Sequence, residues 1–235
     1  MSILCTICAR GGSKGLKNKN LKKILKYPLI IYTIKVAIKS KLFDKIVLST
    51  DSIDIMNVCK KYDIEIFFKR PKSLSSNHIN KIDVIRHALL KSETKFNCKF
   101  DYIFDLDVSS PLRTSEDILN FYKIFLKRKS SNAFSVIPAN KNPYFNIVEN
   151  KSNTFKPVTK LNKKIYSRQK APLVYNMNAS IYIWKREILK KYDSVFTKNT
   201  SIYVMDERCI DIDNLNDFEL VDFYIKKYKK WQIQK

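Results

Sequence analysis

Residues 3–15 read ILCTICARGGSKG, an apolar run of strand length followed by a loop that holds Gly11, Gly12 and Gly15. These are all three glycines of the 235-residue chain. Glycine lets a backbone approach its neighbours closely, and backbone N–H groups with lysines beside them can bind phosphate. The stretch therefore predicts the first strand of an α/β sheet, ending in a phosphate-binding loop.

The spacing within this loop argues against two familiar nucleotide motifs. Neither GxGxxG nor GxxxxGK[ST] fits, because Lys14 precedes the last glycine and Ser13 precedes that lysine. A dinucleotide-binding Rossmann enzyme and a P-loop NTPase are therefore not supported. The remaining alternative to a phosphate site is a plain turn between strand and helix with solvated lysines.

The rest of the chain alternates between two hydrophobic periodicities. Strands are predicted at residues 45–50, 64–68, 102–106, 134–138, 179–184 and 202–205, and helices at 28–40, 52–62, 80–91, 115–129 and 214–229. This alternation is typical of an α/β fold, with a Rossmann-like, mostly parallel sheet and helices on both faces. Residues 140–177 break the pattern and predict an inserted β-rich arm, which leaves 1–139 and 178–235 as the α/β domain.

The formal net charge of +23 comes overwhelmingly from lysines spread along the chain. No helix-turn-helix, RNP-type aromatic motif or zinc module organises these lysines, so specific nucleic-acid binding is the lesser alternative and anionic small substrates are favoured. No apolar run reaches the length of a membrane span. The five cysteines form an odd set without a secretion signal, which predicts a cytoplasmic protein with reduced thiols.

Asp211 and Asp213 lie two residues apart, so both carboxylates can face one side of an extended segment. Carboxylate oxygens suit Mg²⁺, which keeps waters and bridges phosphates. The alternative is a pair that caps the helix predicted at 214–229. Asp105 and Asp107 share a side at a predicted strand end in the same way.

Residues 9–16 (ARGGSKGL), together with Lys19, Asn20 and Leu21, resemble the N-terminal signature of CMP-sialic acid synthetases, the acylneuraminate cytidylyltransferases. The resemblance continues, in the family's order, through residues 28–30, 49–52, 70–71, 110–113, 178–183 and 211–213. It covers nearly the whole chain. It implies a Rossmann-like nucleotide-binding domain, a dimerisation arm at 140–177, a homodimer, CTP as substrate and Mg²⁺ as cofactor.

The resemblance also implies roles for residues near the nucleotide. The triphosphate is assigned to the glycine loop and its cations, with Arg10 and Lys19 as catalytic cations for the charge that develops in the transition state. These residues are Arg10, Gly11, Gly12, Ser13, Lys14 and Lys19. Asn20 is implied to read the cytosine edge, because an amide both donates and accepts hydrogen bonds, although a helix N-cap is the alternative. Arg70 is placed near the nucleotide.

The acceptor sugar is implied to meet residues from two parts of the chain. Ser110 is assigned to the sugar site, and Arg168 and Gln169 of the arm are assigned to the sugar pocket of a partner subunit. Arg168 is the candidate for the sugar carboxylate, since a guanidinium binds carboxylates through two hydrogen bonds. Asp211 and Asp213 are the implied Mg²⁺ ligands.

One departure from the family signature concerns Asp107, which stands where a glutamine is common. Asp107 is then a further metal ligand, a contact to the substrate, or the general base in place of a metal-bound water. The run DLDVSSPLR at residues 105–113 resembles the subgroup that activates legionaminic or pseudaminic acid. The expected reaction is attack of a nonulosonic acid's anomeric hydroxyl on the α-phosphate of CTP, with GTP or Kdo as same-fold alternatives.

Overall fold

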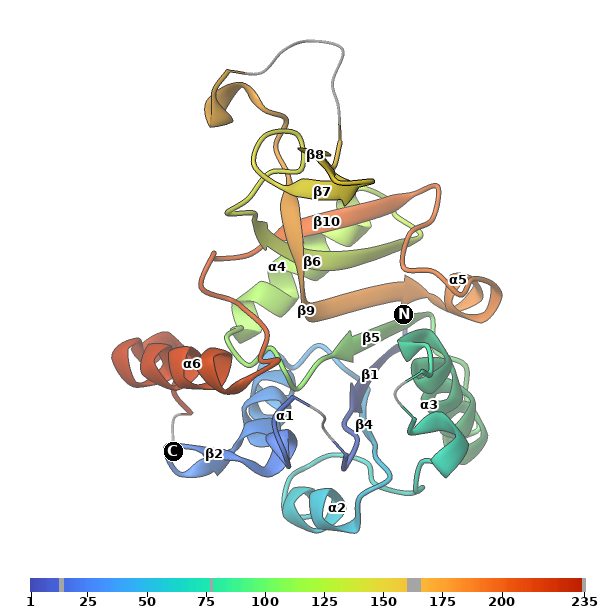
Figure 1. Cartoon of the computed structure of the whole chain (residues 1–235). Coiled ribbons are helices and arrows are strands. Elements are labelled where there is room, and N and C mark those ends of the chain that lie inside the picture. Colours follow the sequence, from blue (N-terminus) through green and yellow to red (C-terminus); the bar gives the residue numbers. More distant parts are fainter. Residues whose placement is uncertain (13–14, 77, 160–165, 234–235) are drawn as a thin grey trace.

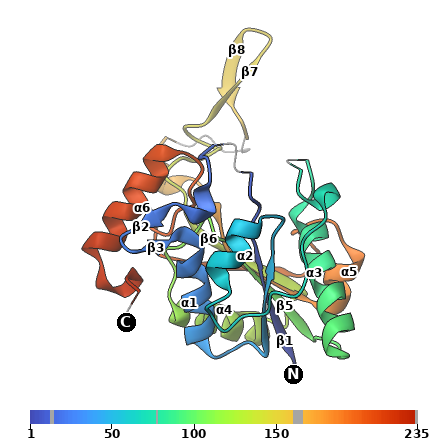
Figure 2. The same ribbon diagram turned by 90° about the horizontal axis from the view of Figure 1, so that it is seen from below.

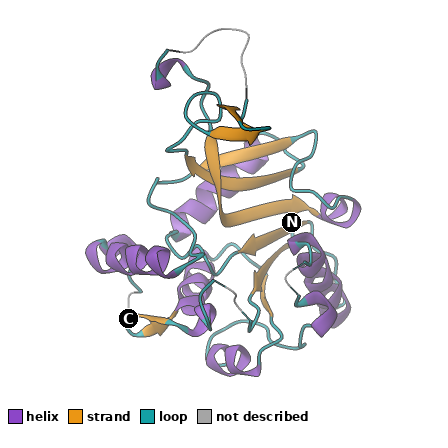
Figure 3. Cartoon of the chain, viewed as in Figure 1, coloured by secondary structure: helices purple, strands orange, loops and turns teal. Residues whose placement is uncertain are grey.

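A six-stranded sheet forms the centre of the protein, in the strand order β10-β6-β9-β5-β1-β4. The computed structural model describes residues 1–12, 15–76, 78–159 and 166–233. The strands of this sheet are β1 (Ile3–Cys8), β4 (Lys45–Ser49), β5 (Tyr102–Leu106), β6 (Asn132–Pro138), β9 (Tyr175–Lys185) and β10 (Thr200–Val204). Two small pairs, β2 (Lys23–Ile24) with β3 (Tyr27–Pro28) and β7 (Val148–Lys151) with β8 (Thr154–Pro157), lie outside it (Figure 3).

The sheet is mostly parallel, as predicted. Strand β1 pairs in parallel with β4 and β5, and β6 pairs in parallel with β10. Strand β9 is antiparallel to both of its neighbours, β5 and β6. The carboxyl ends of β4, β1 and β5 therefore share one edge of the sheet, where α/β proteins bind their ligands.

The strand predicted at residues 64–68 is wrong, because only Glu65 makes a bridge, to Val47 of β4. Phe67 and Phe68 both pack against the same hydrophobic cluster, so their side chains do not alternate between two faces as strand residues do. The chain then turns so that Arg70 N–H donates a hydrogen bond to the Thr50 carbonyl at 2.8 Å, beyond the end of β4.

Helices cover both faces of the sheet (Figures 1 and 2). They are α1 (Leu29–Ser40), α2 (Ile53–Cys59), α3 (Lys81–Phe96), α4 (Ser115–Lys127), α5 (Arg186–Lys191) and α6 (Leu215–Lys227), with short 3-10 turns η1 (Lys19–Leu21), η2 (Lys72–Leu74), η3 (Arg168–Lys170) and η4 (Lys229–Trp231). The side chains of β1 alternate between two cores. Cys5 and Ile7 pack with residues of α1, α4 and α6, whereas Leu4 packs with α3 and α5.

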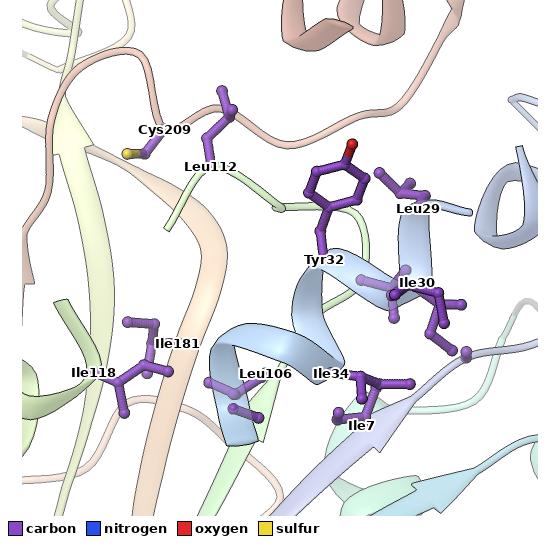
Figure 4. Packing of buried hydrophobic residues seen from close by; sticks show 14 of the residues in the cluster. Ile7, Leu29, Ile30, Tyr32, Ile34, Leu106, Leu112, Ile118, Ile181 and Cys209 are labelled. Atoms are coloured by element: carbon purple, nitrogen blue, oxygen red, sulfur yellow. The ribbon is translucent and has the colours of Figure 1, made fainter. Parts of the chain in front are cut away.

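Helix α1 fixes the loop that precedes it. Figure 4 shows Ile34 of α1 beside Ile7 of β1, within the larger of the two cores. Tyr32 is buried in the same core, and its hydroxyl donates a hydrogen bond to the Ile24 carbonyl at 2.8 Å. The segment between β1 and α1 is therefore anchored to a rigid helix at its far end.

The segment predicted as an arm contains the hairpin β7–β8, which projects beyond the sheet (Figure 2). Its apolar side chains face solvent in the single chain, with Phe155 70% and Val148 59% exposed. Strand β9 begins at Tyr175, inside the predicted arm, and continues into the central sheet. Among the described helices, none combines the length and the apolar character needed to cross a membrane.

Candidate active site

A pocket of about 420 Å³ lies at the carboxyl ends of β1 and β5. It is lined by Cys8, Arg10, Gly15, Leu16, Lys19 and Asn20 from β1 and the segment after it, by Arg70, Leu74, Ser75, Ser76, Ile79, Lys81 and Val84 from the segment that leads into α3, and by Asp107, Ser109 and Asp213. Six of the predicted site residues meet here: Arg10, Lys19, Asn20, Arg70, Asp107 and Asp213. Ser13 and Lys14 lie outside the described residues.

Two glycines of the first loop are required by close packing. A Cβ on Gly15 would stand 2.0 Å from the Asp213 carbonyl oxygen, and one on Gly11 would stand 3.0 Å from the Ser52 Cβ. The Gly11 N–H donates a hydrogen bond to Asp51 Oδ1 at 2.9 Å. Gly12 has no neighbour within 4 Å of its Cβ position. The loop is therefore held closely at Gly11 and Gly15, whereas the Cβ position of Gly12 is open.

Lys19 and Asn20 are positioned by turn η1. The Lys19 ammonium donates a hydrogen bond to the Ile212 carbonyl at 2.5 Å, so it is held beside the segment that carries the two aspartates. Asn20 is buried, and its amide donates to the Arg10 carbonyl at 2.9 Å. The cap position of η1 belongs to Asn18, so the N-cap alternative for Asn20 is wrong.

Arg70 is the most unusual cation of the pocket. Its side chain is 4% exposed, and the nearest carboxylate oxygen, Asp51 Oδ1, is 3.7 Å from Nη2. Both Nε and Nη2 are buried without a hydrogen-bond partner among the described residues. Because a buried donor left unpaired costs free energy, a pocket-lining guanidinium of this kind is typical of a ligand-binding group.

Lys81, the first residue of α3, was not predicted from the sequence. Its ammonium lies 2.6 Å from Asp107 Oδ2, 2.9 Å from Asp105 Oδ2 and 4.4 Å from the centre of the Tyr182 ring. Asp105 is fully buried, and its other oxygen accepts a hydrogen bond from Thr6 Oγ1 at 2.8 Å. The signal that could have revealed Lys81 is the pair Asp105 and Asp107. Two carboxylates on the same side of a strand end repel each other unless a cation lies between them.

Asp107 is engaged at both oxygens. Oδ1 accepts from the Ser109 N–H at 2.9 Å and the Ser109 hydroxyl at 2.8 Å, while Oδ2 faces Lys81. Burial alone would raise the pKa of Asp107, but Lys81 and Ser109 outweigh it and hold the pKa well below its ordinary value. A carboxylate so stabilised is a weak base at neutral pH. A metal ion on Oδ2 would also have to displace an ammonium.

Asp211 and Asp213 do not cap the helix that follows. Asn214 caps α6 and forms a capping box with Asp217. The pKa of Asp211 is raised, first by burial and then by the neighbouring charge of Asp213. Two repelling carboxylates offer the hard oxygen donors that suit Mg²⁺, which needs only one or two carboxylates when phosphates and waters complete its shell. No group of three or more acidic, His or Cys side chains forms a metal cluster in the described part of the chain.

Of the predicted sugar-site residues, Asp107 lines this pocket, whereas Ser110 and Gln169 do not. Ser110 is 1% exposed, and its hydroxyl lies within hydrogen-bond distance of the Asn178 and Ile210 carbonyls, at 2.8 and 3.3 Å. It therefore fastens the loop after β5 to the rest of the protein. Gln169 lines a different pocket, beside Asn142 and Pro172, and Arg168 belongs to η3 in the same segment.

Comparison with known proteins identifies the family. Residues 4–230 match the family model described as Cytidylyltransferase. The chain belongs to the cytidylyltransferase family. It is 51% identical over 224 residues to CMP-N,N'-diacetyllegionaminic acid synthase from Campylobacter jejuni, covering 95% of this chain and 94% of that protein. It is 49% identical over 226 residues to post-translational flagellin modification protein B from Campylobacter coli, covering 96% of this chain and 95% of that protein.

The fold of this cytidylyltransferase recurs among solved structures. CMP:2-keto-3-deoxy-manno-octonic acid synthetase complexed with CTP aligns with a TM-score of 0.69 at 15% sequence identity, covering 97% of this chain and 99% of that chain. At this identity the likeness shows the fold alone. It confirms the predicted Rossmann-like α/β class, and the family match confirms that the chain is a nucleotidyltransferase.

Proposed function

We propose that this cytidylyltransferase condenses CTP with a nonulosonic acid of the N,N'-diacetyllegionaminic type, giving the CMP-sugar and pyrophosphate. The observation that carries the proposal is the meeting, in one pocket, of the clamped glycine loop, Lys19 and the Arg70 guanidinium, whose Nε and Nη2 lack hydrogen-bond partners among the described residues. The choice of sugar rests on the 51% identical relative.

In the proposed reaction, the anomeric oxygen of the sugar forms a bond to the α-phosphorus of CTP. The bond from that phosphorus to the bridging oxygen of the β-phosphate breaks, pyrophosphate leaves, and the hydroxyl proton passes to solvent. Lys19 and Arg10 stabilise the negative charge that grows on the phosphates, which is the main task of a phosphoryl-transfer site. Arg70 and Asn20 bind the nucleoside portion, and the open backbone at Gly12 faces the phosphates.

Asp211 and Asp213 would hold the Mg²⁺ that we propose as cofactor. When bound, the ion neutralises charge on the phosphates of CTP and pyrophosphate. Lys19 would stabilise the same region, because its ammonium is fixed to the carbonyl of Ile212, the residue between the two aspartates in the sequence. In this proposal, the Lys19 ammonium and a Mg²⁺ held by Asp211 and Asp213 act on the same phosphates.

The test is a pyrophosphate-release assay that crosses four nucleoside triphosphates with N,N'-diacetyllegionaminic, pseudaminic, N-acetylneuraminic and 3-deoxy-manno-octulosonic acids. We expect CTP with N,N'-diacetyllegionaminic acid to give the highest kcat/KM. A preference for GTP, or for the octulosonic acid, would replace the proposal by one of its same-fold alternatives. Lack of CTP-dependent turnover with all four sugars would refute it.

We propose a homodimer formed through the arm, with Arg168 and Gln169 reaching the sugar pocket of the partner subunit. The support is the apolar surface of this segment, where Phe155, Val148 and Val158 are 70%, 59% and 45% exposed. Light scattering should give the mass of a dimer for the wild type and of a monomer for Phe155→Asp. Lys156→Asp, on the next residue of β8, is the control that should stay dimeric, and a monomeric wild type would refute the proposal.

We place the enzyme in the cytoplasm, where CTP is made and where its five free cysteines stay reduced. Nucleic-acid binding through the charge of +23 is the lesser alternative. It predicts tight, steeply salt-dependent binding in a gel-shift titration. It also predicts that Lys19→Ala and Asp211→Ala change little beyond binding.

A further inference from the structure

The Lys81–Asp105–Asp107 cluster has no role in the proposed phosphate chemistry, although two of its members line the pocket. One ammonium stands between two carboxylates, 2.9 Å from Asp105 Oδ2 and 2.6 Å from Asp107 Oδ2. Asp105 is fully buried, whereas the Lys81 and Asp107 side chains are 32% and 24% exposed. Lys81 and Asp107 therefore form the surface of the cluster that a ligand can touch.

The charge of the cluster decides which part of a ligand can bind there. With both carboxyls ionised, two carboxylates and one ammonium leave a net negative charge. Phosphate groups and a sugar carboxylate would be repelled by it, since like charges at short range in a partly buried site are unfavourable. The portion of the substrate that meets Lys81 and Asp107 therefore carries no negative charge.

The hydrogen-bonding capacity of the cluster narrows the choice further. A carboxylate offers about four acceptor positions, and three hydrogen bonds, two from Ser109 and one from Lys81, occupy Asp107. An ammonium has about three donors. One of them makes a hydrogen bond to Asp107 Oδ2, and the contact with Asp105 Oδ2 at 2.9 Å is an ion pair without a hydrogen bond. An acceptor position of Asp107 and donor capacity of the adjoining ammonium therefore remain. A hydroxyl group, which accepts and donates through a single atom, is their complement.

We propose that Lys81 and Asp107 form a specificity pair that binds a hydroxyl group of a substrate. The Lys81 ammonium donates a hydrogen bond to the hydroxyl oxygen, and the Asp107 carboxylate accepts a hydrogen bond from the hydroxyl. The inference rests on the proposed function and adds a recognition role to the same pocket. The hydroxyl belongs either to the ribose of CTP or to the acceptor sugar. The chemistry is shared, so the experiment has to separate the two sources.

The variants are Asp107→Asn, which keeps the shape of the side chain and the Lys81–Asp105 pair, and Lys81→Arg, which keeps the charge. Asp83→Asn, in the first turn of the same helix α3, is the matched control. KM and kcat are measured for CTP and for the sugar in each, with thermal melts to confirm folding. We expect Asp107→Asn to raise the KM of one substrate by about tenfold or more, as for a lost hydrogen bond to a charged group, and Lys81→Arg to raise the same KM less.

The source of the hydroxyl is identified by comparing the kcat/KM for CTP with the kcat/KM for its 2′-deoxy and 3′-deoxy analogues. A ribose contact predicts that the wild type prefers CTP over one analogue and that Asp107→Asn abolishes this preference. A sugar contact predicts an unchanged preference and a raised KM for the sugar alone. If both KM values stay within about twofold of the wild type, or if only kcat falls, the inference is overturned.

Failure of the proposed function would look different, because the wild type itself would show no turnover with any nonulosonic acid. The inference is then decided by titrating CTP and the two deoxy analogues into the wild type and Asp107→Asn. Equal ratios of CTP affinity to analogue affinity in the two proteins would exclude a ribose contact and, with no acceptor sugar left to supply the hydroxyl, would overturn the inference. A smaller ratio of CTP affinity to analogue affinity in Asp107→Asn than in the wild type would support the inference.

Discussion

The two ends of the central strands differ in how their polar groups are satisfied. At the amino end, carboxylates are matched to donors. Asp44 accepts from the Ile3 N–H at 2.6 Å, Asp101 accepts from the Ser2 N–H at 2.8 Å, and Arg186 donates to both oxygens of Glu93, at 2.6 and 2.9 Å. These contacts hold the first strand and α3 in place.

At the carboxyl end the groups are arranged less favourably. Arg70 has buried donors without a hydrogen-bond partner among the described residues, and Asp211 and Asp213 repel each other. Natural proteins keep such arrangements where a ligand relieves them. The comparison teaches that the amino end contributes stability and the carboxyl end function, so substitutions at the two ends should affect different measurements.

The largest expected effect is on activity at the carboxyl end. Lys19→Ala should lower kcat/KM by about 100- to 1000-fold, the usual loss when a preorganised donor to the transition state is removed. The melting temperature should change little. Lys17→Ala, an exposed lysine two residues earlier, is the control and should behave like the wild type. Similar losses in both variants would mean that general positive charge, and not the position of Lys19, drives the rate.

The acidic pair should give a smaller effect, visible in the dependence on metal. Asp213→Asn is expected to weaken Mg²⁺ activation by about 10- to 100-fold, in the range found when a ligand or its support is lost. The wild type should lose activity in a chelator and recover it with added Mg²⁺. Asp217→Asn, in the capping box of α6, tests whether the loss is only a loosened helix. An unchanged Mg²⁺ midpoint in Asp213→Asn would contradict the assignment.

Gly15→Ala should affect both stability and activity, because its Cβ would clash with the Asp213 carbonyl at 2.0 Å. Overpacking of this kind costs about 1–3 kcal/mol, which corresponds to a fall in melting temperature of roughly 2–12 °C for a domain of this size. Gly12→Ala is the matched control for stability, since nothing lies within 4 Å of its Cβ position. Equal melting temperatures for the two variants would show that the loop rearranges freely.

The smallest effect is expected at the amino end and should appear only in stability. Burial would raise the pKa of Glu93, but hydrogen bonds from Arg186 and the Phe100 N–H outweigh it and lower the pKa below its ordinary value. The ion pair thus stabilises the fold above the ordinary carboxyl pKa, and this contribution is lost as the pH falls through the lowered one.

Glu93→Gln should therefore lower the free energy of unfolding by about 1–2 kcal/mol at pH 7 and by less at pH 3, while kcat/KM at pH 7 stays near that of the wild type. Glu187→Gln removes the 78% exposed partner of the same arginine and should cost less. Urea titrations at both pH values measure the difference. A loss that is equal at pH 7 and pH 3 would contradict the role of the ionised carboxylate.

The sequence was informative where one short segment carries the signal. The glycine loop with Lys19 and the pair Asp211 and Asp213 are each confined to a short stretch of sequence. The structure brings Gly15, Lys19 and Asp213 together in one pocket. Lys81 was missed because its partners lie 24 and 26 residues away, at the end of β5, and only the packing of α3 on the sheet joins them. Ser110, a motif position assigned to the sugar site, is buried and contacts the Asn178 and Ile210 carbonyls, which the motif alone did not indicate.

The contact between Gly15 and Asp213 joins the beginning of the chain to a segment close to its end. A nascent chain can form β1 and its glycine loop early. The Asp213 backbone against which Gly15 packs is present only after residue 213 has been synthesised. Protein domains begin to fold during synthesis from the N-terminus. The pocket is therefore incomplete until this segment has been synthesised, and we expect the nascent chain to bind its nucleotide only late in translation.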